Sequence, residues 1–162
     1  MKDKTIRVLL VDDEEELVRS LRKRMLRRGF SVVGALDGPE AIATAEQRLF
    51  DVAVIDLKMP GMGGLEVLEK LKAIQPMIQA IVLTGHGSVE AAHQSGRLDA
   101  TSFLLKPADF DHLAERIQKC CDEKRNKQRE AFDREIQQIV GSYRSPHEIM
   151  EDTARARAKY EQ

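Results

Sequence analysis

Short apolar runs recur along the first three quarters of the chain, and polar turns and helical patterns separate them. Five runs have the length and composition of buried strands: residues 6–11, 31–35, 52–55, 80–83 and 101–105. The helical patterns lie around 17–25, 41–49, 65–71, 88–95 and 110–121, and the fourth of these is weak and rich in small residues. Five strands alternating with five helices predict an α/β domain with a parallel sheet covered on both faces, over residues 1–121.

The second of these helices should begin at Asp37-Gly-Pro39, because Asp is a good helix cap and Pro suits the first helical position. Its apolar residues recur at helical spacing and are expected to face the core: Ala41, Ile42, Ala45 and Leu49.

Polar side chains that could carry chemistry follow four of the five predicted strands: Asp12, Asp13, Asp56, Thr84 and Lys106. Each alone has an ordinary structural explanation, such as helix capping for the aspartates or a turn for the threonine. However, the carboxyl ends of parallel strands share one edge of a sheet, which is where ligands bind in such folds. The coincidence of all five therefore favours a functional site at that edge.

Three carboxylates held close together repel one another and call for a hard cation, and oxygen ligands with room for water suit Mg²⁺. A metal-bound aspartate beside an ammonium group and a hydroxyl group is equipped to accept a phosphoryl group. Asp56 is the natural acceptor, because it ends a buried strand and precedes an open loop.

Four motifs in this order resemble the receiver domain of response regulators, the phospho-acceptor half of two-component signalling. They are Val11-Asp12-Asp13-Glu14, Asp56-Leu-Lys-Met-Pro-Gly-Met-Gly-Gly64, Leu83-Thr84-Gly85-His86-Gly87 and Phe103-Leu-Leu-Lys106-Pro107. The resemblance, which is closest to chemotaxis-type regulators, covers about residues 5–121. It implies a doubly wound, flavodoxin-like (βα)5 fold in an essentially stand-alone receiver.

By that resemblance, Asp56 takes a phosphoryl group from a phosphohistidine on a sensor histidine kinase or a phosphotransfer protein. Asp13, Asp56 and the backbone carbonyl of Lys58 would hold Mg²⁺, and Asp12 would contribute through water. Lys106 would pair with the phosphoryl group. The resemblance implies no enzyme beyond autophosphorylation from small phosphodonors and autodephosphorylation.

The resemblance also implies a switch, in which Thr84 moves toward the phosphoryl group and Phe103 turns inward behind it. This would change the face made by the fourth helix, the fifth strand and the fifth helix, to which an unidentified output protein would bind. A cis peptide is expected at Lys106-Pro107. The chain departs from the family at Asp99-Ala100, where Gly-Ala is usual, and at position 103, where a Tyr is often found.

Two other classes of protein remain as alternatives. A phosphatase or mutase with an aspartyl nucleophile would need a second Asp two residues after Asp56, and Lys58 stands there. A nucleotide-binding or flavin-binding module would need a Gly-rich phosphate loop after the first strand, where residues 12–16 are all acidic.

Residues 122–162 are expected to form a helical extension with no recognised output domain. The polar segment 122–130 should continue the fifth helix, and an apolar stripe at helical spacing follows: Phe132, Ile136, Ile139, Val140 and Tyr143. Ser145-Pro-His-Glu148 is a capping box that predicts a final helix. The stripe could pack on the receiver, on a second copy or on another protein. We favour a homodimer through this segment.

Charge and composition limit the partners. The formal net charge of −1 gives no reason to expect direct DNA binding or attraction to an anionic membrane. No apolar run is long enough to span a membrane, and the start lacks a signal-peptide core. The two cysteines, Cys120 and Cys121, fall on a helical pattern, which fits a reducing compartment. We therefore expect a cytoplasmic protein.

Overall fold

A computed structural model describes residues 5–85, 102–142 and 145–160. Within these ranges no helix combines the length and apolarity needed to cross a membrane. The predicted helix at 88–95 and the departure at Asp99-Ala100 lie outside the described residues, as do His86 and Tyr143. The chain divides into two compact units, Met1–Cys121 and Asp122–Gln162, which are described separately below.

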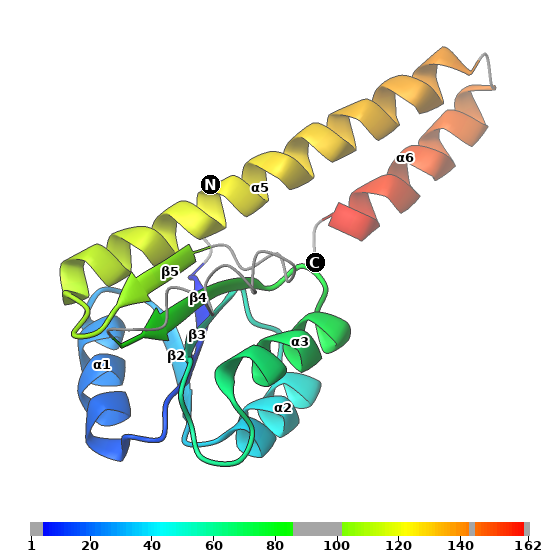
Figure 1. Cartoon of the computed structure of the whole chain (residues 1–162). Coiled ribbons are helices and arrows are strands. Elements are labelled where there is room, and N and C mark those ends of the chain that lie inside the picture. Colours follow the sequence, from blue (N-terminus) through cyan, green and yellow to red (C-terminus); the bar gives the residue numbers. More distant parts are fainter. Residues whose placement is uncertain (1–4, 86–101, 143–144, 161–162) are drawn as a thin grey trace. The chain divides into compact units, whose positions relative to one another are not determined.

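The first unit is built on a five-stranded parallel sheet in the order β2-β1-β3-β4-β5. This sheet and its helices are drawn in Figure 1. Its strands are β1 (Arg7–Val11), β2 (Ser31–Ala35), β3 (Val52–Asp56), β4 (Gln79–Thr84) and β5 (Ser102–Leu105). The helices that begin in this unit are α1 (Glu15–Arg27), α2 (Gly38–Gln47), α3 (Gly64–Ile74) and α5 (Phe110–Gly141). The predicted α/β fold with a parallel sheet is confirmed, and β3 is the central strand.

The core has two layers, one on each face of the sheet. Alternate residues of the strands point to opposite faces, so neighbours such as Leu9 and Leu10 belong to different layers. One layer packs under α1 and the first turns of α5, and the other under α2 and α3. Every residue of β3 is buried, because both of its faces are covered and both of its edges are paired.

Local sequence signals account for the limits of the first two helices. Gly29 follows α1 with φ +88°, a backbone conformation that favours glycine and ends the helix. Asp37 caps α2, since its side chain accepts a hydrogen bond of 2.8 Å from the backbone N–H of Glu40. The predicted start of α2 is therefore correct.

The predicted inward face of α2 is wrong at one position. Ala41 and Ala45 are buried, but Leu49 is 54% exposed. The helix ends at Gln47 and the next residue has an extended backbone, so Leu49 no longer follows the helical face. Phe50 is buried and fills the core at that point. Extrapolating a helical period beyond the helix end caused the error.

A buried glutamine joins the end of α2 to the start of β3. Gln75, which is 6% exposed, accepts a hydrogen bond from the backbone N–H of Phe50 at 2.9 Å. Its amide nitrogen donates to the carbonyls of Ala45 at 2.8 Å and Arg48 at 2.7 Å. We expect Gln75→Ala to lower the free energy of unfolding by about 2–4 kcal/mol, since it leaves buried backbone groups without partners. Urea denaturation should show this loss, whereas Gln47→Ala at an exposed position should change little.

The second unit is a helical hairpin. It contains the distal part of α5, which continues unbroken to Gly141, and α6 (Pro146–Tyr160). The predicted continuation of the fifth helix through 122–130 is thus confirmed. The predicted capping box is also present: Ser145 N–H and Oγ donate to Glu148 Oε2 at 3.0 and 2.8 Å, and Glu148 N–H donates to Ser145 Oγ at 3.4 Å.

Helix α6 covers part of the apolar stripe that the sequence predicts on α5. Phe132 packs edge-to-face on Tyr160, with ring centroids 5.9 Å apart, and Ala156 of α6 is buried. Lys159 Nζ bonds Glu135 Oε2 at 3.1 Å beside this contact. The sequence predicts the receiver, a second copy or another protein as the surface that covers this stripe, whereas in the structure α6 covers part of it. A homodimer through the extension stays a prediction.

Candidate functional site

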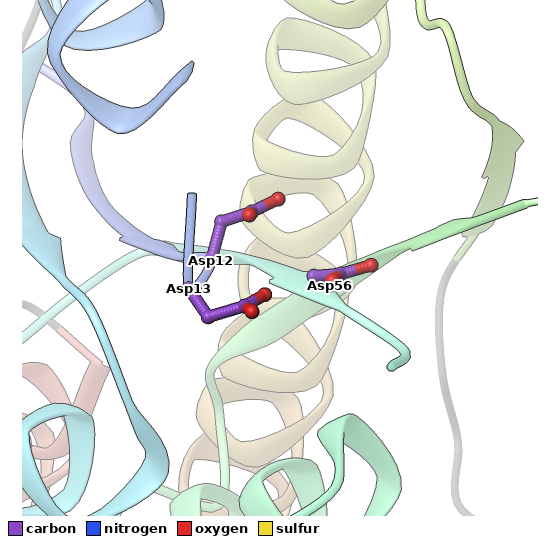
Figure 2. Close-up of side chains that lie close together, drawn as sticks. All are labelled: Asp12, Asp13 and Asp56. Atoms are coloured by element: carbon purple, nitrogen blue, oxygen red, sulfur yellow. The ribbon is translucent and has the colours of Figure 1, made fainter. Parts of the chain in front are cut away.

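Three aspartates meet at the carboxyl edge of the sheet. Asp12 and Asp13 follow β1, and Asp56 is the last residue of β3, the neighbouring strand. Each offers a carboxylate oxygen, and these oxygens all lie within 4.8 Å of one another. Figure 2 shows the three side chains close together at the ends of these two strands. The structure therefore brings together the carboxylates that the sequence predicts at this edge.

Asp12 is the buried anchor of the cluster. Its side chain is fully inaccessible to solvent, and both oxygens have partners. Oδ2 accepts a hydrogen bond from Lys106 Nζ at 2.6 Å, and Oδ1 accepts one from the backbone N–H of Glu14 at 2.9 Å. The charge-assisted hydrogen bond between Lys106 and Asp12 connects the loop after β5 to the loop after β1.

Lys106, the first residue after β5, contacts several of these carboxylates. Its Nζ lies 3.3 Å from Asp56 Oδ1 and 3.9 Å from Glu14 Oε1, in addition to the Asp12 contact. Burial opposes the charge of Lys106, but its hydrogen bond to Asp12 and the nearby carboxylates outweigh this effect and raise its pKa. The ammonium group is therefore firmly protonated. The predicted cis peptide at Lys106-Pro107 is present.

Asp56 is only 6% exposed, and its surroundings make ionisation costly. Burial raises the pKa of Asp56, and the charge of Asp12 adds to this rise, although Lys106 and the backbone N–H of Lys58 act against it. The ammonium group of Lys106 contacts Asp12 and Asp56, and the carboxylate of Asp13 adds a further negative charge beside them. A divalent cation with oxygen ligands fits this excess of negative charge.

Thr84 and Phe103 lie on the two strands beyond Asp56. Thr84 ends β4, one residue past the β4 partner of Asp56, and is 4% exposed. Its hydroxyl donates to the carbonyl of Gly85 at 3.2 Å. Phe103 of β5 pairs in register with Val82 and is half-buried against the layer under α2 and α3.

The loop after β3 passes very close to the start of α3. Gly61 has φ +75°, which favours glycine at this turn. A Cβ atom on Gly64 would lie 2.1 Å from the carbonyl oxygen of Asp56 and 2.9 Å from Leu57 Cα, far inside contact distance. Gly64 therefore permits the close packing that fixes the backbone at Asp56. Its N–H donates to the carbonyl of Leu57 at 3.0 Å.

Sequence reasoning gave no role to Glu14 or Gly64, although both lie within the quoted motifs. Glu14 contributes a backbone donor to Asp12 and a carboxylate near Lys106. No periodicity or charge pattern could have identified these contacts. For Gly64 the sequence did offer a signal: a glycine at the first position of a predicted helix can indicate that two backbone segments approach closely.

Comparison with known proteins places the chain in a family. The sequence model of the family "Response regulator receiver domain" matches residues 8–118 of this chain. The chain therefore belongs to the receiver domain family of response regulators, whose members are phospho-acceptors in two-component signalling and bind Mg²⁺ at an acidic pocket.

Its relatives include regulatory proteins of which the chain matches only a part. The transcriptional regulatory protein ZraR of Salmonella typhimurium is 33% identical over 114 residues, which are 70% of this chain and 26% of that protein. The photosynthetic apparatus regulatory protein RegA of Cereibacter sphaeroides is 38% identical over 106 residues, 65% of this chain and 58% of RegA. The chain thus spans about a quarter of the length of ZraR.

A solved structure matches the receiver more completely. It is a CheY-like response regulator receiver domain from Methanospirillum hungatei JF-1, which is 31% identical with a TM-score of 0.73. The match covers 76% of this chain and 99% of that one.

Proposed function

We propose that Asp56 is the phospho-acceptor of this receiver. The observation that carries the proposal is its position: Asp56 ends the central strand, with Lys106 Nζ 3.3 Å from its carboxylate and the oxygens of Asp12 and Asp13 within 4.8 Å. A carboxylate oxygen of Asp56 would attack the phosphorus atom of a phosphohistidine. A P–O bond then forms, the P–N bond breaks, and the imidazole leaves.

Lys106 would neutralise charge on the phosphoryl group as it is transferred. Its contact with Asp12 holds the ammonium group at the right end of the sheet, and its contact with Asp56 places it beside the acceptor. Since the Lys106 ammonium is present before transfer, little reorganisation is needed. Asp12 therefore positions Lys106, in addition to any part it takes in binding metal.

The donor set fits Mg²⁺, which would neutralise charge on the phosphoryl oxygens when bound. Asp13 and Asp56 would be direct ligands together with the backbone carbonyl of Lys58, and Asp12 would act through water. The burial of Asp12 and its two hydrogen bonds support this difference between the two neighbouring aspartates.

Thr84 and Phe103 are the proposed switch residues. Thr84 sits next to the acceptor strand, and its hydroxyl donates a hydrogen bond to the carbonyl of the next residue, Gly85. A phosphoryl oxygen on Asp56 could therefore attract that hydroxyl. The resulting change would be read on the surface made by the segment after β4, by β5 and by α5.

The proposed partners are a sensor histidine kinase or phosphotransfer protein as donor, and an output protein that recognises the phosphorylated surface. ZraR and RegA are named as regulatory proteins. We expect that this chain does not bind DNA directly. We also propose a cytoplasmic location and a homodimer through 122–162. Cys120 and Cys121 are buried thiols on α5, which is compatible with a reducing compartment.

A small phosphodonor tests the function. Incubating the full chain with acetyl phosphate and Mg²⁺ should add one acid-labile phosphoryl group, observed by intact-mass spectrometry, and EDTA should prevent it. This reaction would also establish autophosphorylation from small donors. Rapid catalytic release of phosphate with no stable adduct would instead favour the phosphatase alternative. Absence of any adduct at saturating donor and Mg²⁺ would count against the proposal.

The two neighbouring aspartates should differ in their effect on metal affinity. We expect Asp13→Asn to weaken Mg²⁺ binding strongly, because it removes a direct ligand, and Asp12→Asn to weaken it less. Added Mg²⁺ should raise the melting temperature of the wild type by mass action and should hardly affect Asp13→Asn. Calorimetric titration of both variants checks the order, and equal or reversed losses would refute it.

A further inference from the structure

Glu14 places a fourth carboxylate at the edge of the aspartate site. Its Oε1 lies 3.9 Å from the ammonium nitrogen of Lys106, and its side chain is 68% exposed to solvent. The same nitrogen lies 3.3 Å from Asp56 Oδ1. The sum of these two distances, about 7 Å, is therefore the largest separation that the two carboxylate oxygens can have. A solvent-exposed negative charge thus stands close to the proposed acceptor.

The backbone of Glu14 is held in place on both sides. Its N–H donates to Asp12 Oδ1 at 2.9 Å, and its carbonyl accepts a hydrogen bond from the N–H of Val18 at 3.0 Å. Glu14 occupies the cap position of α1, but its side chain makes no capping hydrogen bond. The carboxylate of Glu14 is therefore not used to end the helix, and it lies beside the ammonium group of the site instead.

The other glutamates of this acidic segment do not take the same position. Glu15 is paired with Arg19 at 3.0 Å, one turn further along α1. Glu16 is exposed and, in the part of the chain that the structure describes, forms no ion pair with the ammonium group of the site. Among the same residues, Lys58 in the loop after β3 forms no ion pair with Glu14. The charge of Glu14 is therefore shared with the site's ammonium group and with solvent.

We propose that Glu14 is a specificity-determining residue, whose carboxylate repels anionic small-molecule phosphodonors from the acceptor. This inference rests on the proposed function, in which Asp56 accepts the phosphoryl group. A donor brings negatively charged oxygens to Lys106, and Glu14 competes with them for the same ammonium group. A separation of at most about 7 Å is within the Debye length of about 8 Å at physiological ionic strength, so salt does not fully screen the repulsion. The repulsion grows with the negative charge of the donor.

Labelling rates with two small donors test the inference. Acetyl phosphate is a dianion at neutral pH and releases acetate when its P–O bond breaks. Phosphoramidate is a monoanion, because its nitrogen is protonated, and it releases ammonia when its P–N bond breaks. At saturating Mg²⁺ and low ionic strength, Glu14→Gln should raise the second-order rate constant about threefold to tenfold for acetyl phosphate and only about twofold to threefold for phosphoramidate. Glu14→Lys, which reverses the charge, should raise both rate constants further.

Glu16→Gln is the matched control, because it removes the same charge at an exposed position two residues away. It should change both rate constants less than about twofold. At about 1 M salt, where the Debye length falls to about 3 Å, the advantage of Glu14→Gln should disappear.

Four results would overturn the inference. They are a Glu14→Gln variant that labels no faster than the wild type, an equal gain in Glu16→Gln, an equal gain with both donors, and a gain that persists in high salt. In each case the wild type is still labelled, so the proposed function stands. If neither donor labels the wild type at saturating Mg²⁺, the proposed function fails and the role of Glu14 fails with it.

Discussion

Replacing Asp56 by Asn should abolish the acid-labile phosphoryl adduct that acetyl phosphate and Mg²⁺ produce. Asn keeps the shape of the side chain but is not nucleophilic enough to form the acyl phosphate bond. The other two aspartates do not compensate. Asp12 is fully buried and occupied by hydrogen bonds, and Asp13 is an exposed residue without the central position of Asp56. Undiminished labelling of the variant would reject the assignment.

Measuring the stability of Asp56→Asn shows whether a loss of labelling comes from the missing carboxylate or from unfolding of the variant. Burial raises the pKa of Asp56, so its charge opposes folding once the pH rises above the range in which an ordinary Asp ionises, about pH 4. The stability that a protonated Asp56 contributes is present below that range and is lost as the pH rises through the raised pKa. In EDTA, Asp56→Asn should therefore match or exceed the wild-type melting temperature at neutral pH.

A matched control comes from the residue just before the same strand. Asp51→Asn makes the same chemical change at the opposite end of β3. Asp51 bonds the guanidinium of Arg7 at 3.0 and 3.1 Å and its backbone N–H at 3.0 Å, so the variant should lose some stability. It should still be phosphorylated, because Asp56 and its neighbours are unchanged.

The strands could be predicted from the sequence because their apolar runs are short and end in clear turns. β2 occupies 31–35, as expected, and the acidic and basic residues at the strand ends meet because parallel strands share one edge. The end of α2 could not be predicted, because no glycine or proline follows Gln47. The helical spacing of the apolar residues therefore predicted, wrongly, that the helix continues to Leu49.

Tertiary contacts account for what was missed at the site and in the extension. The positions of Asp12 and Lys106 in the sequence could not predict the 2.6 Å hydrogen bond between their side chains. Likewise, the residues of α6 that pack on α5 are too few to form a recognisable apolar face in the sequence. Ala156 is buried there and Tyr160 meets Phe132, but both lie in a helix that is mostly charged.

Gly64→Ala should cost several kcal/mol of stability and should disturb the site as well. The new Cβ atom would lie 2.1 Å from the carbonyl oxygen of Asp56, and this neighbour is backbone and cannot rotate away. Relief requires the start of α3 and the loop after β3 to move apart, which shifts the backbone that carries Asp56. Overpacking of side chains costs about 1–3 kcal/mol, and a clash with backbone should cost at least as much.

Gly63→Ala is the control for this change. A Cβ atom there would meet only the carbonyl of Leu57 at 3.9 Å, an ordinary contact, and φ of −71° suits any residue. Urea denaturation should show a near-neutral effect for Gly63→Ala and a large loss for Gly64→Ala. Mg²⁺ affinity, measured where both variants are still folded, should fall only for Gly64→Ala, because only that substitution moves Asp56 and the Lys58 carbonyl. If the two variants were equally stable and bound Mg²⁺ alike, the close approach at Gly64 would not be what positions the acceptor.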